Sequence, residues 1–154
     1  MTIVLLLIVH ALVGVVLLGA VTHQAVSLMR HAPTRTDSFL ERYSRVTQGA
    51  FTRAVVCLYV TNTVLGAMLY PSYRLDVRIP FEEMGLAWAV GFFELKEHFA
   101  GIGLGVLPMY AYTWRSATSE ASSRARASLT WVLACIVWWD FLVGHMLNNI
   151  RGLG

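Results

Sequence analysis

Four ionisable side chains lie within five positions of an otherwise apolar stretch: Glu94, Lys96, Glu97 and His98. The flanking residues are apolar for at least two helical turns on each side, over 86–93 and 99–112. An ionisable group at membrane depth costs roughly 2.5 to 3.5 kcal/mol on insertion scales, so such groups tend to face a bundle interior and to mark a functional site. The cluster therefore predicts a polar site within a membrane-spanning helix.

The composition favours a membrane protein over a soluble one. Hydrophobic residues make up 56% of the 154 residues and charged residues only 14%, whereas soluble domains carry roughly 25% charged residues. A helical span needs about 20 apolar residues, and four runs are long enough: about 3–29, 50–70, 86–114 and 129–150. The sequence therefore predicts an all-α integral membrane four-helix bundle that forms a single domain, 1–154.

Arginines set the expected orientation. The segment 30–53 holds five Arg and two acidic residues, and the segment 115–126 holds three Arg and one Glu. Positive charge accumulates in cytoplasmic loops, so we expect both segments inside and both termini outside, in the bacterial inner membrane. Pro71 is expected to end the second span, which leaves 70–83 as an outer loop.

The charge pattern also bears on partners. The basic residues occur without the interleaved aromatic residues that single-stranded nucleic acid requires, so nucleic acid is excluded. The partner implied by the apolar runs is the lipid bilayer.

Several ionisable residues of three spans lie at similar depth: His10, Glu94, His98, Asp140 and His145. With ~1.5 Å of rise per residue, they lie roughly 8 to 15 Å below the outer surface. The sequence therefore predicts that the three histidines converge in the outer half of the bundle.

Helical spacing places glycines beside two of these histidines. On the third span, Glu94, His98, Gly101 and Gly105 follow the spacing i, i+4, i+7 and i+11. Residues at this spacing share one face of a helix. On the first span His10 shares a face with Gly14. A flat glycine surface beside a histidine can hold a macrocycle between helices, and axial histidine ligation is a standard way to bind haem iron. We therefore expect haem b, with His98 as one axial ligand and His10 or His145 as the other.

Other polar residues have expected roles around this haem. Arg74 and Arg78 are placed to meet its propionates at the outer surface, while Lys96 points away from the glycine face and could pair with Glu97 or a propionate. The expected function is electron transfer or redox chemistry facing the outer compartment, with a quinone or another redox protein as the partner.

Two other functions remain open. A metal ion, iron, copper or zinc, could be held directly by the three histidines with Glu94 and Glu97, although the Glu-x-x-His spacing of bundle di-iron sites does not occur. Alternatively, the candidate catalytic acids Glu94, Glu97 and Asp140 relay protons, as acids within membranes do in pumps, or the chain is an accessory subunit of a larger complex. The glycines alone are equally compatible with close helix packing. Enzymatic activity and a homo-oligomer also stay open.

Three short motifs carry a family resemblance: Val9-His10-Ala11, Phe39-Leu40-Glu41-Arg42 and Phe93-Glu94-Leu95-Lys96. In their order along the chain they resemble the small four-helix membrane proteins of the CopD/HemJ type, of which HemJ-type members are protoporphyrinogen oxidases associated with haem b. The resemblance implies a four-helix haem protein in which His10 and Lys96 correspond to the family's span-one histidine and span-three lysine. Four residues depart from the family pattern: Glu94, Glu97, His98 and His145. The protoporphyrinogen substrate is therefore not carried over.

Overall fold

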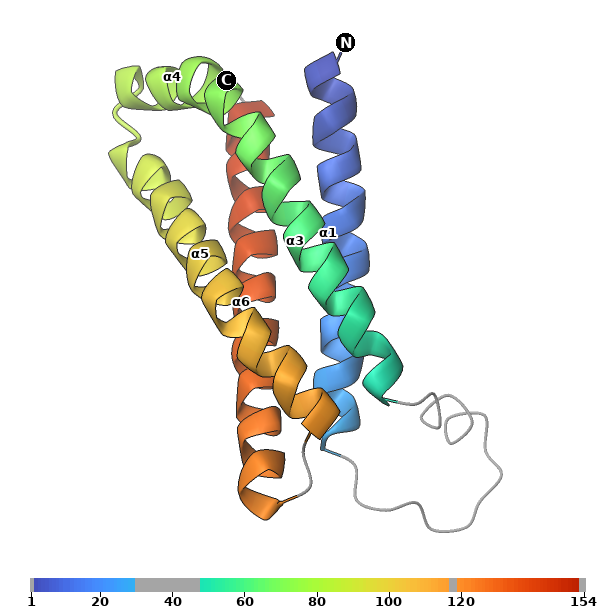
Figure 1. Cartoon of the computed structure of the whole chain (residues 1–154). Helices are drawn as coiled ribbons and strands as arrows, with labels where there is room; N and C mark the ends of the chain where they lie inside the picture. The colour runs from blue at the N-terminus through green and yellow to red at the C-terminus, as the bar shows by residue number, and fades with distance from the viewer. Residues whose placement is uncertain (1, 30–47, 117–118, 153–154) are drawn as a thin grey trace.

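The computed structural model describes residues 2–29, 48–116 and 119–152. Over these ranges the chain forms no strand and four long helices: α1 (Thr2–Ser27), α3 (Gln48–Tyr73), α5 (Ala87–Ser116) and α6 (Glu120–Gly152). Helix α1 packs against α3 and α6, and α5 packs against the same two helices, which makes a four-helix bundle (Figure 1). The predicted all-helical architecture is confirmed for this part of the chain.

Three helical stretches within the described ranges are long and apolar enough to cross a membrane: Thr2–Ser27, Gly49–Glu83 and Glu120–Ile150. Helix α5 is 30 residues long but carries the charged cluster, and it is not among the three. By length and composition, the described residues thus provide three of the four predicted spans. The start of α1 and the end of α6 lie at the same end of the bundle (Figure 1), which we call the outer end after the predicted orientation.

The second helix does not end at Pro71, contrary to the expectation from the sequence. Helix α3 continues to Tyr73, and a π-helical turn, Arg74–Arg78, and α4, Ile79–Glu83, follow it. Figure 1 shows this helical path bending over the outer end of the bundle. Pro71 removes only one backbone donor and is exposed, while Pro80 sits in the first turn of α4, where a backbone N–H has no helical acceptor. The outer connection is therefore helical and not a loop.

The chain reverses direction at Gly85, whose φ of +73° lies in the left-handed region. Its N–H donates to the Glu82 carbonyl at 3.1 Å, and the next N–H, of Leu86, donates to the Phe81 carbonyl at 2.8 Å. Glycine ends many helices in this way because it has no Cβ to oppose the left-handed conformation. This turn sends α5 back along the bundle.

Helix α6 begins about nine residues before the expected span. The Ser122 N–H donates to the Ser119 hydroxyl at 3.2 Å, so Ser119 caps the helix and satisfies one of the donors that every helix start leaves open. The segment of serines and alanines that was expected to be a loop is therefore largely the first turns of α6.

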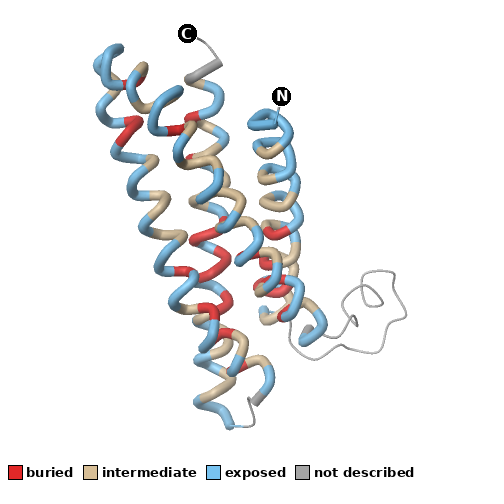
Figure 2. The backbone as a smooth tube through the Cα atoms, turned by 45° about the horizontal axis from the view of Figure 1, so that its top comes forward, coloured by how far each residue is buried: buried red, intermediate tan, exposed pale blue. Residues whose placement is uncertain are grey.

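An apolar layer fills the middle of the bundle. Its buried members come from all four long helices: Leu17, Val21, Val55, Leu107, Leu133 and Val137. Toward the inner end, the Gln24 side-chain amide donates to the Thr52 hydroxyl at 3.2 Å and accepts a hydrogen bond from the Tyr110 hydroxyl. In Figure 2 buried residues gather over this inner half of α1, whereas its outer half is exposed or half-buried. Helix α1 is thus packed more tightly over its inner half than over its outer half, while a second buried cluster joins α4, α5 and α6 at the outer end.

Candidate functional site

The α5 face that was predicted to hold the cofactor points out of the bundle. Glu94, His98, Gly101 and Gly105 are all exposed, and a Cβ atom built on either glycine would meet none of the described residues within 4 Å. The His98 ring lies against its own helix, with Nδ1 2.7 Å from the main-chain oxygen of Glu94. This face is therefore not covered by another described helix of the same chain.

His145 is exposed as well. Its ring lies parallel to that of Phe141, one turn earlier on α6, with the ring centroids 6.3 Å apart. Of the three histidines predicted to converge, only His10 is half-buried. Among the residues that the structure describes, no three His, Cys, Asp or Glu side chains form a group that could hold a metal ion. A directly bound metal therefore has no such ligand set in this part of the chain.

Lys96 is turned toward the neighbouring helix α6. It is half-buried, and its Cε lies 3.5 Å from the position that a Cβ on Gly144 would take. Its ammonium nitrogen lies 5.4 Å from the centroid of the Phe93 ring, a distance at which a cation and an aromatic ring attract each other. The lysine stem thus lies against Gly144, between α5 and α6.

His10 is turned toward α3. Its Cε1 lies 3.4 Å from the position of a Cβ on Gly66, and its ring interacts with the main chain of Asn62. In return, the Asn62 side-chain oxygen lies 3.6 Å from the position of a Cβ on Gly14. Small residues let helices approach closely in membranes, and here two glycines allow α1 and α3 to enclose these polar side chains.

These contacts bring together one polar residue from each long helix, and we call the group the interior site: His10, Asn62, Lys96 and Asp140. Lys96 is close enough to interact electrostatically with both His10 and Asp140. Counted from Thr2 and Ala87 at ~1.5 Å per residue, His10 and Lys96 lie roughly 12 and 14 Å from the outer ends of their helices. Asp140 lies roughly 18 Å from Gly152 by the same rise. These three residues therefore lie at a similar level of the bundle, and Asn62 lies beside His10.

Three atoms of the interior site are buried and have no hydrogen-bond partner among the described residues: His10 Nδ1, Asn62 Oδ1 and Asp140 Oδ1. About nine in ten or more of the buried polar groups in proteins are hydrogen-bonded, and a catalytic role or a bound water or ion is among the explanations for an exception. Lys96 adds a cation with three donors to this set of mainly acceptor atoms. The arrangement can therefore bind and exchange protons.

Tyr59 closes the interior site on its inner side. Its hydroxyl donates to the Ala100 carbonyl at 3.0 Å, and it interacts electrostatically with Asp140. Val55, one turn from Tyr59 on α3, and Leu107, two turns from Ala100 on α5, belong to the apolar layer. That layer separates the interior site from the hydrogen-bonded group of Gln24, Thr52 and Tyr110 at the inner end.

The arginines that were predicted to meet propionates have other partners. Arg78 Nε lies 2.7 Å from Glu82 Oε1, and its Nη1 lies 3.4 Å from Glu94 Oε1. Arg74 is exposed and donates to the Tyr70 hydroxyl at 3.3 Å. The Arg78–Glu94 contact ties the outer π-helical turn to α5.

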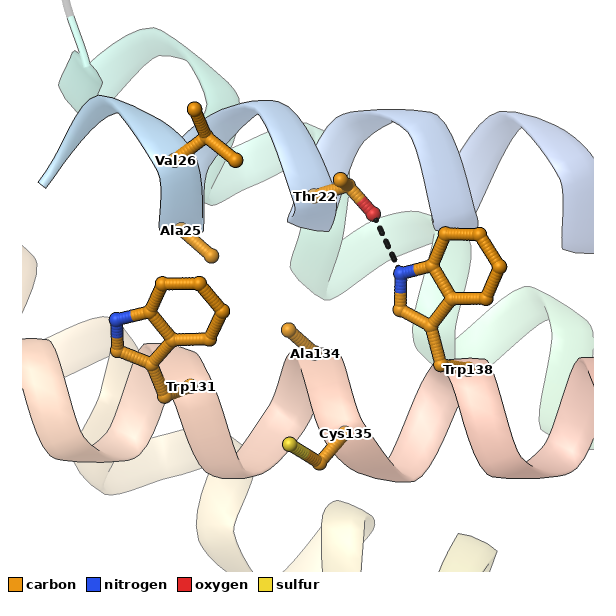
Figure 3. Close-up of a pocket in the computed structure, with 7 residues that line it drawn as sticks. All are labelled: Thr22, Ala25, Val26, Trp131, Ala134, Cys135 and Trp138. Carbon is orange, nitrogen blue, oxygen red and sulfur yellow. Dashed lines mark hydrogen bonds between the residues drawn. The ribbon is translucent and has the colours of Figure 1, made fainter. Parts of the chain in front are cut away.

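A small cavity between α1 and α6 contains none of the predicted site residues. It has a volume of about 160 Å³ and is lined by Thr22, Ala25, Val26, Trp131, Ala134, Cys135 and Trp138. Figure 3 shows Trp131 and Trp138 on either side of Ala134, and the Trp138 indole N–H donates to the Thr22 hydroxyl at 2.9 Å. The lining of the cavity is therefore almost entirely apolar.

The predicted haem can be compared with this geometry. His10 could hold a haem, because its Nδ1 is buried and has no hydrogen-bond partner among the described residues. His98, His145 and Gly101 are exposed and do not join His10 in the bundle interior. Of the three predicted ligands, His10 alone is therefore turned into the bundle, and the haem stays a prediction.

Asn62 and Tyr59 were not singled out in the sequence, yet a signal for Asn62 was present. Three helices repeat one pattern, in which a polar residue of the interior site precedes a glycine by four positions: His10 and Gly14, Asn62 and Gly66, Asp140 and Gly144. Residues four apart share a helix face. Each pair therefore places a polar side chain beside a glycine, where a neighbouring helix can approach closely. Tyr59 carried no comparable signal.

The chain matches no protein-family model, no curated protein and no solved structure. The resemblance to CopD/HemJ-type proteins thus rests on the short sequence motifs alone. Of their residues, 39–42 lie outside the described ranges, while His10 and Lys96 meet in the interior site.

Proposed function

We propose that the chain is an integral membrane protein with four spans and both termini outside, in the bacterial inner membrane, and that its interior site takes up and releases protons on the outer side. In this function His10 and Asp140 bind protons, Lys96 supplies the fixed positive charge, and Asn62 orients its neighbours. The protons serve a redox centre or a quinone held by a partner, so the chain acts as a subunit of a larger membrane complex.

The surface of the bundle supports membrane insertion. On the outer half of α1 more than half of the surface of each of several large apolar residues is exposed: Ile3, Val4, Leu5, Ile8 and Leu12. Exposed apolar surface on this scale marks contact with a membrane or a partner. Helix α5 completes the four spans, because its 30 residues extend roughly 45 Å and its lysine is directed between helices.

The observation that carries the proton function is the set of three buried, unpartnered polar atoms beside Lys96. Two of the three belong to side chains that change protonation state, and all three lie at membrane depth in the proposed orientation. Ionisable groups at that depth mark proton relays in pumps and transporters. The apolar layer beneath Tyr59 supports exchange with the outer side and not through the whole bilayer.

Infrared difference spectroscopy of the protein in lipid membranes tests this function. Between acidic and alkaline pH, we expect a carboxyl C=O band that disappears in Asp140→Asn and changes its titration in Lys96→Met. The exposed residue Glu83 provides the control, since Glu83→Gln should leave this band unchanged. A protein whose Asp140 shows no pH-dependent band at all would refute the proton function.

Thiol labelling tests the one-sided access. In a background with Cys57→Ser and Cys135→Ser, the variant Asn62→Cys should react with a membrane-impermeant thiosulfonate added to the outer side. The same reagent on the inner side should not react, because the apolar layer blocks the way. Equal reaction from both sides would show a continuous pore instead.

A haem b protein that uses His10 as its axial ligand is a second candidate function, favoured by the buried, unpartnered Nδ1 of that residue. Bound haem would supply one-electron redox chemistry, and His10 would hold it while Lys96 would offer its charge to a propionate. A visible spectrum of the purified protein, oxidised and reduced, tests this candidate. His10→Ala should remove the Soret band, and His98→Ala, at an exposed position, should retain it. If the protein without any substitution is colourless, the haem is ruled out.

A further inference from the structure

Tyr73 lies between the outer surface and the interior site, and the proton function above gives it no role. The residue is only 9% exposed, and its hydroxyl is buried with no hydrogen-bond partner among the described residues. A buried hydroxyl in that state is rare in proteins and calls for a functional reason.

The ring of Tyr73 is connected to the interior site through Phe93. The two rings are stacked, with centroids 3.4 Å apart and planes 10° from parallel. The Lys96 ammonium nitrogen lies 5.4 Å from the centroid of the same Phe93 ring. Phe93 thus holds Tyr73 of α3 and Lys96 of α5 on one aromatic support.

On its outer side Tyr73 faces the charged groups of the outer surface. It is close enough to interact electrostatically with Arg78 of the π-helical turn, with Glu94 and Glu97 of α5 and with Tyr70 of its own helix. Glu94 is exposed and Glu97 is half-buried, so both carboxylates can exchange protons with the outer side. The π-helical turn begins directly after Tyr73, and such turns are frequent at functional sites.

We propose that the Tyr73 hydroxyl is the relay through which protons pass between the outer carboxylates, Glu94 and Glu97, and the interior site. The proposal rests on the proton function of the interior site. In this step the phenol oxygen accepts a proton from Glu94 or Glu97 while the phenol gives its own proton toward Asp140 or His10, which binds it. The carboxylate that gave its proton is left charged, and the charge of the phenol is the same before and after. The Arg78–Glu94 ion pair positions the outer carboxylate for this transfer, and the Phe93 stack holds the phenol in place.

A pH jump tests the relay. The full chain in lipid vesicles is exposed to a caged proton, a laser pulse releases it, and the carboxyl band of Asp140 is followed in time. Tyr73→Phe removes the hydroxyl but keeps the stacked ring, and it should slow proton uptake by about tenfold or more, as the loss of a proton-transfer group does. The final amplitude of the band should stay the same, because Asp140 itself is unchanged.

Tyr70→Phe is the matched control. It removes a hydroxyl from the same outer part of α3, one that is bonded to Arg74, and it should retain the uptake rate of the unchanged protein. If Tyr73→Phe takes up protons at the rate of the unchanged protein and the Asp140 band is present, the relay is overturned. The proton function of the interior site is then unaffected. Absence of the Asp140 band from the unchanged protein would overturn both.

Discussion

Gly103 of α5 lies directly against the hydroxyl group of Tyr59 on α3. A Cβ atom at position 103 would overlap the oxygen of that hydroxyl and the ring carbon that bears it. The same hydroxyl donates to the Ala100 carbonyl at 3.0 Å, so α3 and α5 meet through one buried tyrosine. This contact forms the inner wall of the interior site.

Gly103→Ala should therefore destabilise the bundle. Forcing an extra methyl group into a packed contact costs about 1 to 3 kcal/mol, and here the methyl displaces Tyr59 from its bond to α5. Gly101→Ala is the control, because a Cβ at 101 meets open space while both variants gain the roughly 1 kcal/mol of helix propensity that alanine has over glycine. Thermal unfolding in detergent should give a lower midpoint for Gly103→Ala than for Gly101→Ala. Equal midpoints would show that Tyr59 moves aside without cost.

Tyr110→Phe should weaken the inner end of the bundle. It removes the buried hydrogen bond that the Tyr110 hydroxyl donates to Gln24, and a hydrogen bond of this kind contributes about 0.5 to 1.5 kcal/mol net. Tyr112, two residues later on α5, is 63% exposed, so Tyr112→Phe should leave the unfolding midpoint unchanged. The same midpoint for both variants would mean that this bond contributes nothing to stability.

Gly144→Leu should disturb the interior site without unfolding the protein. A Cβ at 144 would make ordinary contact with Lys96 Cε at 3.5 Å, but the longer leucine side chain needs the space of the lysine stem. We expect the infrared titration of Asp140 to change as it does in Lys96→Met, with the helical circular dichroism retained. Gly105→Leu, on the exposed face of α5, should leave that titration as it is. An unchanged Asp140 titration in Gly144→Leu would show that Lys96 does not depend on Gly144 for its place.

The two cysteines report on membrane insertion, because both are exposed on the outside of the bundle. Counted from Gln48 and Glu120 at ~1.5 Å per residue, Cys57 and Cys135 lie roughly 14 and 22 Å along their helices, which places both in the hydrocarbon in the proposed orientation. A water-soluble maleimide should fail to label them in intact membranes and should label both after denaturation. Rapid labelling in intact membranes would place these helix faces in water and contradict the spans.

The helices and their apolar character could be predicted from the sequence because both depend on local properties. Long apolar runs decide where helices form and how apolar they are, and the four predicted runs correspond to α1, α3, α5 and α6. The continuation of α3 past Pro71 was missed, because a proline removes one donor but does not decide whether exposed flanking turns stay helical. Its cost depends on surroundings that the sequence pattern does not contain.

For the site, the sequence indicated which residues could carry chemistry: His10 and Asp140 were named from type and depth, and Lys96 from its place in the charged cluster. Only the tertiary structure decided which of them meet. A helical pattern defines the faces of α5 relative to one another, but not which face turns inward. That choice depends on partner surfaces on other helices, here the contact of Lys96 with Gly144 and the fit of Gly103 against Tyr59. The same rotation turns Glu94 and His98 outward, which is why spacing alone pointed to the opposite face.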